Sequence, residues 1–294
     1  MNLVQTRSTR PMPLHGRHVF LSVLFCAGMS ITGTTAAQVT PASPATPATP
    51  ATPATPPAQS TPPAQPAADN HAAAPARKVS LPPSADLQYR IKAQQSGLTI
   101  DGTGLVKWQQ ADGKFSASSE SRASLFGKVL EASSSGAVDQ NGLMPAVFND
   151  KRFRKEATTT TFDRQSNTIR FSASAVTYPI KGGEQDRNSV IWQLIGTARG
   201  AEGKFKAGSE WRFFVVGQRD AEQWVFKVGK SETLRTPQGE VRAVHIVRAP
   251  PPDARAQQLD IWLAPSMEWY PVRLRFTDPD GEYIEQTLES IGHG

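Results

Sequence analysis

Alternating apolar and polar residues dominate the chain from Leu87 to Ile291, in short runs separated by turn residues. Apolar side chains occupy every second position in residues 272–277 and again in residues 169–174. Because successive side chains of a β-strand point to opposite faces, this pattern predicts strands with one buried face. Denser apolar runs at residues 211–216 and 223–228 predict neighbouring strands that are covered on both faces or central in the sheet.

Turn residues and one helical pattern complete this part of the chain. The pair Asp112-Gly113 favours the positive φ angles of a tight hairpin, and Asn141-Gly142, Gly182-Gly183 and Asp280-Gly281 mark further turns. Residues 186–195 place apolar side chains on one helical face after residues of the capping type. We therefore predict a mainly β fold with one helix among about ten strands, in which a curved antiparallel sheet or half-barrel is closed by the helix.

The N-terminal residues have a different composition. Basic residues precede an apolar run that contains Cys26, and Thr35-Ala36-Ala37 follows this run. This order is typical of a secretory signal peptide, which we place at residues 1–37, with export by the general secretion route. An uncleaved membrane anchor is the alternative, but polar residues interrupt the run too early for a good span. Bulky Phe25 before Cys26 argues against lipid attachment.

Removal of this signal would leave a mature chain without cysteine or a transmembrane segment. We therefore expect a periplasmic protein, and we exclude disulfides, thiolate catalysis and cysteine-ligated metals.

Residues 38–78 form a tract rich in proline, alanine and threonine, with repeated Ala-Thr-Pro. Proline removes backbone donors and favours extended polyproline II, so we predict a disordered linker. A spacer that holds the domain away from a surface and a tolerated low-complexity insertion are both open. The remaining residues, 79–294, are long enough for a single antiparallel β domain with its own core.

The charge of this domain is nearly balanced. The whole chain carries 32 Lys and Arg against 26 Asp and Glu, but from residue 79 onward the counts are 27 and 25. Binding of nucleic acid over the whole surface needs many cations that neutralise phosphates. We therefore expect no nucleic acid partner.

Several short motifs, taken together in their order and spacing, are similar to those of a known family. They are Ser135-Gly136-Ala137-Val138, Asn141-Gly142-Leu143-Met144-Pro145 with Phe148, Gln185-Asp186 with Ser189, Thr236-Pro237-Gln238-Gly239, Ile261-Trp262-Leu263-Ala264 and Tyr270-Pro271-Val272-Arg273. Over about residues 86–291 the chain resembles the proteobacterial exported proteins of domain-of-unknown-function family 3108. The resemblance implies a periplasmic, mostly antiparallel β domain and no assigned catalytic residue. A looser analogy links this fold to the half-barrel carriers of the lipoprotein-localisation type.

Candidate chemistry is sparse in the predicted domain. Its two histidines, His245 and His293, are too few for a histidine-rich metal site, and we expect no metal or cofactor. The acidic segment at residues 278–282 is interpreted as a β-turn, with carboxylate-only calcium binding as the alternative.

No Gly-x-Ser-x-Gly elbow supports a serine hydrolase. We interpret Asp186 and Ser189 as helix-capping residues and His245 as a packed strand residue. We assign no catalytic residue, although a hydrolase with an unrecognised site remains a third candidate.

Four cations surround an aromatic ring in the run Lys151-Arg152-Phe153-Arg154-Lys155. Lys151, Arg152, Arg154 and Lys155 are candidate contacts to anionic lipid headgroups, lipopolysaccharide or acidic glycans. An ordinary edge strand, in which cations discourage aggregation, would carry the same pattern. We favour the edge strand.

All six tryptophans lie in the predicted domain, where they could fill the core or line an apolar cavity. The candidate ligand-binding residues are Trp108, Trp192, Trp211, Trp224, Trp262 and Trp269. The leading hypothesis is a non-enzymatic periplasmic protein that binds an apolar or amphipathic, lipid-like ligand in envelope maintenance. The alternative is a structural or protein-interaction module on a Pro-rich tether, with an envelope protein as partner.

Overall fold

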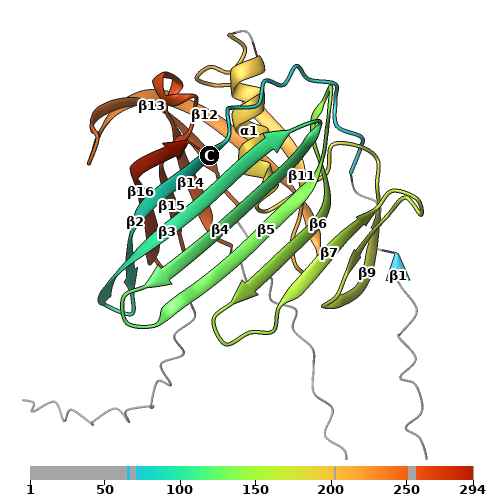
Figure 1. The fold of residues 1–294 in the computed structure, drawn as a ribbon, viewed down its shortest axis with the longest axis horizontal. Helices are drawn as coiled ribbons and strands as arrows, with labels where there is room; N and C mark the ends of the chain where they lie inside the picture. Colours follow the sequence, from blue (N-terminus) through green and yellow to red (C-terminus); the bar gives the residue numbers. More distant parts are fainter. Residues whose placement is uncertain (1–64, 67–70, 202, 251–255, 294) are drawn as a thin grey trace, which may run out of the picture.

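The computed structural model describes residues 65–66, 71–201, 203–250 and 256–293. The predicted signal peptide and most of the predicted linker lie outside these residues. The described strands form one sheet that curls around a single α-helix, α1 (Figure 1). A mainly β fold with a curved antiparallel sheet and one α-helix is therefore confirmed.

The first half of the chain supplies a series of hairpins and one short parallel strand. Its strands are β1 (Gln65–Pro66), β2 (Ala85–Gln95), β3 (Leu98–Ala111), β4 (Lys114–Ala123), β5 (Gly127–Asp139), β6 (Gly142–Arg152), β7 (Thr158–Asp163), β8 (Thr168–Phe171) and β9 (Ser174–Pro179). Strands β2 to β9 pair in chain order and antiparallel, and β1 pairs with β9 in parallel.

The second half begins with a short strand and the helix. It comprises β10 (Gln185–Asp186), α1 (Ser189–Gly200), β11 (Glu210–Val216), β12 (Ala221–Thr236), β13 (Gly239–Arg248), β14 (Gln258–Leu263), the 3-10 helix η1 (Pro265–Met267), β15 (Pro271–Thr277) and β16 (Tyr283–His293). Strand β16 pairs antiparallel with β2, which joins the two halves into one sheet.

Sixteen strands in the described residues exceed the predicted count of about ten, which was too low. Two strands, β1 and β10, have only two residues each and give no periodic signal. In β4 and β5, serine, alanine and glycine occupy many inward positions, so the apolar alternation there is weak.

The two ends of the strand order approach each other because the sheet is strongly curved. Phe214 and Val216 of β11 pack in one apolar cluster with Phe148 of β6 and Phe162 of β7. Across the same gap, the Thr160 hydroxyl donates a hydrogen bond of 2.9 Å to the Gly217 carbonyl. The fold is therefore barrel-like, closed on this side by side chains and not by a continuous ladder.

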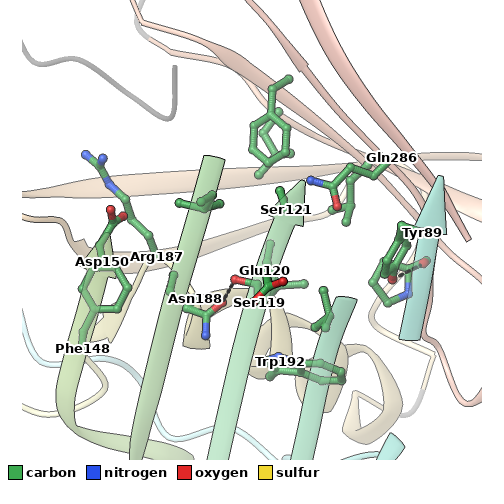
Figure 2. Close-up of a pocket in the computed structure, with 18 of the residues that line it drawn as sticks. Tyr89, Ser119, Glu120, Ser121, Phe148, Asp150, Arg187, Asn188, Trp192 and Gln286 are labelled. Carbon is green, nitrogen blue, oxygen red and sulfur yellow. Dashed lines mark hydrogen bonds between the residues drawn. The ribbon is translucent and has the colours of Figure 1, made fainter. Parts of the chain in front are cut away.

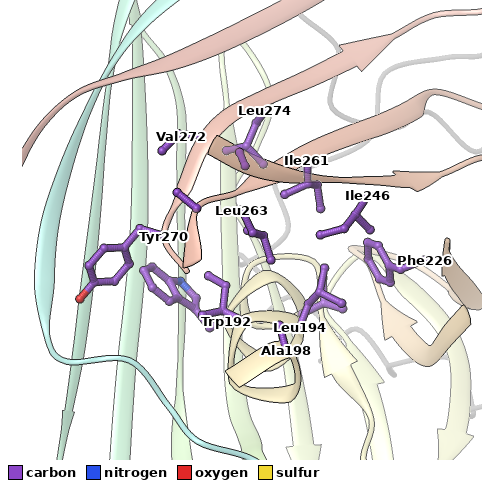
Figure 3. Close-up of a cluster of buried hydrophobic side chains, with 14 of the residues drawn as sticks. Trp192, Leu194, Ala198, Phe226, Ile246, Ile261, Leu263, Tyr270, Val272 and Leu274 are labelled. Carbon is purple, nitrogen blue, oxygen red and sulfur yellow. The ribbon is translucent and has the colours of Figure 1, made fainter. Parts of the chain in front are cut away.

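Helix α1 lies inside the curve and is buried over almost its whole length (Figure 1). Leu194 and Ala198 face the inner side of the sheet, where they meet side chains such as Phe226, Ile246 and Leu263 (Figure 3). Burial of each large apolar side chain stabilises the fold by about 1.5–3 kcal/mol.

The chain segment before β2 crosses the helix closely. The Ser80 amide donates to the Gly196 carbonyl over 2.9 Å. A Cβ atom placed on Gly200 would lie only 2.3 Å from the Lys78 carbonyl oxygen, so a glycine is needed at this crossing. His71 is also buried and stacks on Phe214. Contacts with the domain thus begin before residue 79, where we placed its start.

Candidate functional site

A cavity of about 120 Å³ lies inside the curved sheet, next to the first turn of α1 (Figure 2). The helix contributes Ile191 and Trp192 to its wall, and Asn188 just before the helix also lines it. A second cavity, of about 50 Å³, adjoins the first and shares three lining residues with it, namely Ser121, Leu130 and Gln286. Together the two cavities extend from the helix toward the end of the sheet where the β2–β3 and β4–β5 hairpins turn.

The space exists because inward side chains become smaller with distance from the helix. On β4, Phe115 lies at the helix end of the strand, whereas Ser119 and Ser121 face the cavity. On β3, fully buried Trp108 stands at the helix end, and Gly104 occupies an inward position nearer the cavity. Protein interiors are normally close-packed. The void beside these small inward residues is therefore a departure from ordinary packing, because no neighbouring side chain is large enough to fill it.

One part of the cavity wall is polar. Arg152 donates two hydrogen bonds to Asp150, of 3.1 and 3.3 Å, and Gln218 donates to the same carboxylate over 2.6 Å. The Ser119 hydroxyl donates to the Asn188 side-chain carbonyl over 3.0 Å (Figure 2). Strands β14 and β15 supply apolar side chains to the rest of the wall, which are Leu259, Leu274 and Phe276. The cavity is therefore mostly apolar, with a polar group around Asp150 and a separate polar side chain, Gln286, on β16.

Two of the six candidate tryptophans, Trp192 and Trp224, line this cavity. Trp192 stacks on Trp108, with ring centroids 4.5 Å apart, and Trp108 donates through its indole nitrogen to the Pro82 carbonyl. Trp108 therefore belongs to the core behind the cavity wall.

The other three tryptophans lie elsewhere. Trp211 and Trp269 each pack against Phe205, beyond the end of the helix. Trp262 stacks on His245 at a centroid distance of 4.5 Å, on the outer face of the sheet. The structure thus does not gather the six tryptophans into one site.

The basic run is divided between the inside and the outside of the fold. Arg152 lines the cavity, whereas Lys151, Arg154 and Lys155 are exposed. Strand β6 is paired with β5 on one side and β7 on the other. The edge-strand interpretation is therefore wrong, because β6 lies in the interior of the sheet.

Asp186 and Ser189 exchange hydrogen bonds at the helix start. The Asp186 carboxylate accepts from the Ser189 amide over 2.8 Å, and the Ser189 hydroxyl accepts from the Asp186 amide over 2.9 Å. The two side chains thus bond backbone amides at the helix start, as predicted, in a reciprocal pattern like that of a capping box. The N-cap residue itself is Asn188, whose side chain does not cap the helix. Burial raises the pKa of Asp186 to about 6, against the hydrogen bonds that it accepts.

Ser189 and His245 are not brought together by the fold. His245 lies on β13 and forms a hydrogen bond of 2.8 Å with Asp260, while its other ring nitrogen is 3.4 Å from Glu232. The bond to Asp260 raises the pKa of His245. This arrangement, with the ring stacked on Trp262, is that of a packed strand histidine.

The segment after β15 forms the predicted turn. The Gly281 amide donates to the Asp278 carbonyl over 2.9 Å, which closes the turn. Carboxylate oxygens of Asp278, Asp280 and Glu282 lie within 4.8 Å of one another. The result is an acidic turn at the same end of the sheet as the β2–β3 hairpin.

A wider cleft, of about 430 Å³, lies on the outer face between β2, β15 and the β12–β13 hairpin. Two of its arginines form ion pairs: Arg90 with Glu289 at 2.5 Å, and Arg273 with Glu285 at 3.8 Å. Because this cleft is open and charged, the inner cavity is the better candidate for an apolar ligand.

Sequence reasoning did not single out most residues of the cavity wall. Four of these residues belong to no sequence motif: Tyr89, Ser121, Asp150 and Gln286. Their side chains come close to one another only because the sheet curls. The one sequence feature that could have predicted the cavity is the series of small residues at alternate positions of β4, because they leave the inner face of the sheet unfilled there.

These features define a mainly β protein whose barrel-like sheet holds one helix and, beside it, a small, mostly apolar cavity with polar groups in its wall. The profile of DUF3108, a protein family of unknown function, matches residues 88–289, and the chain belongs to this family. No curated protein matches the sequence. Among the described residues, no helix is long and apolar enough to cross a membrane.

Two solved structures of uncharacterised proteins are similar at low identity. One is a β-barrel-like DUF1849 protein from Brucella abortus, with 13% identity and a TM-score of 0.49 over 75% of this chain and 100% of that chain. The other is a putative exported protein with a YmcC-like fold from Bacteroides fragilis, with 9% identity and a TM-score of 0.28 over 74% of this chain and 100% of that chain.

Proposed function

We propose that the protein is a periplasmic, non-enzymatic binding protein that holds an apolar chain of an amphipathic, lipid-like ligand in its inner cavity and serves envelope maintenance. The observation that carries this proposal is the joined pair of cavities beneath α1. Apolar side chains form most of the wall, and polar groups such as Asp150, Ser121 and Gln286 are distributed among them. Binding sites for small amphipathic molecules have this composition.

The size of the cavity limits the ligand. In another protein, an apolar cavity of about 150 Å³ binds benzene. The volume of about 120 Å³ beside Trp192 therefore suits one narrow hydrocarbon segment. The adjoining space of about 50 Å³ extends this path, so that a single acyl chain fits better than a whole multi-chain lipid.

The predicted export signal supports a location in the periplasm, where single-chain amphiphiles from the envelope are available. We expect the mature chain to begin near Gln38 after cleavage at Ala37. Cell fractionation followed by mass determination of the mature N-terminus tests this expectation. A full-length chain in the cytoplasmic membrane would contradict it.

Ligand binding is tested first by native mass spectrometry of the exported mature protein purified without detergent. A reproducible bound mass that solvent extraction removes supports the proposal. The delipidated protein is then titrated with a fluorescent fatty acid, parinaric acid. We expect saturable binding with one ligand per chain.

A matched pair of variants locates the binding site. Ser121→Leu places a larger side chain at the junction of the two cavities, and Ser116→Leu makes the same change at an exposed position of the same strand. Each 1.4 kcal/mol of lost binding free energy is tenfold in affinity, so we expect about a tenfold loss or more for Ser121→Leu. Equal affinities in the two variants would contradict binding in the cavity.

If neither a bound mass nor fatty acid binding is found, the interaction module becomes the better hypothesis. Deletion of residues 41–75 distinguishes a spacing role in that case. An envelope phenotype that survives this deletion argues against the tether as a spacer.

A further inference from the structure

Exposed apolar side chains gather at the end of the sheet toward which the cavities extend. Among the described residues, three large hydrophobic side chains are exposed: Leu98 by 62%, Leu125 by 80% and Phe126 by 37%. Leu98 follows the turn of the β2–β3 hairpin, and the other two form the turn of the β4–β5 hairpin. Phe126 also lines the second cavity.

The neighbouring β6–β7 turn adds cations beside this apolar tip. The rings of Phe126 and Phe153 lie 6.1 Å apart, and the Arg154 guanidinium lies 4.9 Å from the centre of the Phe153 ring. Figure 1 shows the three hairpin turns at the same end of the sheet. We call five exposed residues in and beside the two adjoining turns the basic apolar tip: Leu125, Phe126, Lys151, Arg154 and Lys155. Exposed Glu156 follows them and is the one acidic residue of the β6–β7 turn.

The cations of this tip are available to an external anion. Lys151 donates to the Lys155 backbone carbonyl over 2.6 Å, and Arg154 stacks on Phe153. In the described part of the chain, no carboxylate forms an ion pair with Lys151, Arg154 or Lys155. By contrast, Lys128 of the same hairpin pair is bound by Glu120 and Glu131, each at 2.9 Å.

The shape and charge of the tip point to a lipid surface. Protruding apolar side chains flanked by cations can enter the headgroup region while the cations meet anionic lipids. The acidic turn at Asp278 lies beyond the β2–β3 hairpin in the strand order, so this hairpin stands between it and the basic apolar tip. Contact with an anionic surface is therefore favoured on the β4–β7 side.

We propose that the basic apolar tip docks the protein on an anionic lipid bilayer and brings the mouth of the cavity to the membrane surface. The purpose of docking rests on the proposed function, because docking would let a single-chain amphiphile pass between the bilayer and the cavity. The docking contact itself does not require a ligand in the cavity.

Flotation of the purified mature protein with vesicles tests the proposal. We expect binding to phosphatidylcholine vesicles that contain phosphatidylglycerol, weaker binding to pure phosphatidylcholine, and loss of binding at high salt. Each cation near an anionic surface contributes about fivefold to affinity. The double variant Arg154→Gln/Lys155→Gln should therefore bind about 30-fold more weakly, and Leu125→Ser/Phe126→Ser at least tenfold more weakly.

The control Lys204→Gln/Lys206→Gln removes the same charge from exposed positions beyond the other end of the helix. It should bind vesicles like the wild type. Circular dichroism melting establishes that all variants are folded. Equal vesicle binding by the wild type and both tip variants, or no binding to anionic vesicles at low salt, would overturn the proposal. Concentration-dependent self-association that is lost in the tip variants would overturn it in favour of a second copy of the chain.

The cavity variant separates this proposal from the proposed function. Ser121→Leu should still bind anionic vesicles, while the tip variants should still bind parinaric acid in solution. If fatty acid binding fails and vesicle binding holds, the docking surface stands without the ligand.

Discussion

Ser134 on β5 donates a hydrogen bond of 2.5 Å from its hydroxyl to the carboxylate of Asp186, on the short strand that leads into α1. Both side chains are buried. The same carboxylate accepts from the Asn188 and Ser189 amides, each over 2.8 Å. One buried acid therefore binds two amides at the start of the helix and attaches this start to the sheet beside the cavity.

This acid should make stability depend on pH. Burial raises the pKa of Asp186 from 3.8 to about 6, so the folded state binds the proton more tightly than the unfolded state. Its contribution to the free energy of unfolding is therefore largest below about pH 4 and falls as pH rises to about 6. Asp186→Asn keeps an acceptor for the two amides and has no charge. We expect it to be more stable than the wild type above pH 6, by about 3 kcal/mol at most.

Urea denaturation across pH 4–8 measures this difference. Asp163→Asn is the control, because hydrogen bonds from Ser166 lower the pKa of the exposed Asp163. Its stabilising effect is present above the unfolded pKa and is lost as pH falls, which is the opposite sign. If the pH profiles of the wild type and the Asp186→Asn variant were parallel, burial would not raise the pKa of Asp186 as we infer.

His245 should titrate above its usual range. Its hydrogen bond to Asp260 raises the pKa of the ring, and this stabilises the fold fully below the unfolded pKa of 6.5. The contribution is lost as pH rises through the folded pKa. We expect Asp260→Asn to lower the pKa of His245, which nuclear magnetic resonance of the ring protons measures. An unchanged titration would show that Asp260 does not hold the charged ring.

The hydroxyl of Thr160 should contribute to stability, because it bridges the gap between the two ends of the sheet. Thr160→Val removes the donor to the Gly217 carbonyl and leaves that acceptor without this partner. We expect a loss of about 1–3 kcal/mol in the free energy of unfolding, because the site is buried. Thr161→Val, at an exposed position of the same strand, should have little effect. Similar denaturation midpoints for the two variants would argue against a role for this bond in closure.

The segment before β2 should constrain α1 most strongly at Gly200, where the two come closest. Gly200→Ala would improve helix propensity, but its Cβ would lie 2.3 Å from the Lys78 carbonyl oxygen. We expect a net destabilisation of about 1–3 kcal/mol, measured by thermal melting. In a shortened chain that begins at residue 83, the Lys78 carbonyl is absent. There, Gly200→Ala should be neutral or stabilising. A similar destabilisation in both backgrounds would show that the segment does not constrain the helix.

Local patterns predicted much of this fold. The alternation in residues 272–277 matches β15, and residues 186–195 contain the start of α1, where Asp186 and Ser189 bond to each other's backbone amides. Such features depend on contacts within a few residues, so the amino-acid order is enough to reveal them. The interior position of β6 was missed, because which strand lies at an edge depends on pairing over long distances.

The sequence by itself determined the local elements: the alternation that makes one buried face, the Asp-Gly turns and the capped helix. Tertiary structure alone decided which inward side chains surround empty space. Ser121 and Gly102 are ordinary small residues in the sequence, and they line the cavities only because the sheet curls around α1 and the helix fills one end of it. Likewise, Phe126 and Phe153 meet only across two hairpins. Curvature and strand pairing sum many distant contacts, so no short stretch of sequence encodes them.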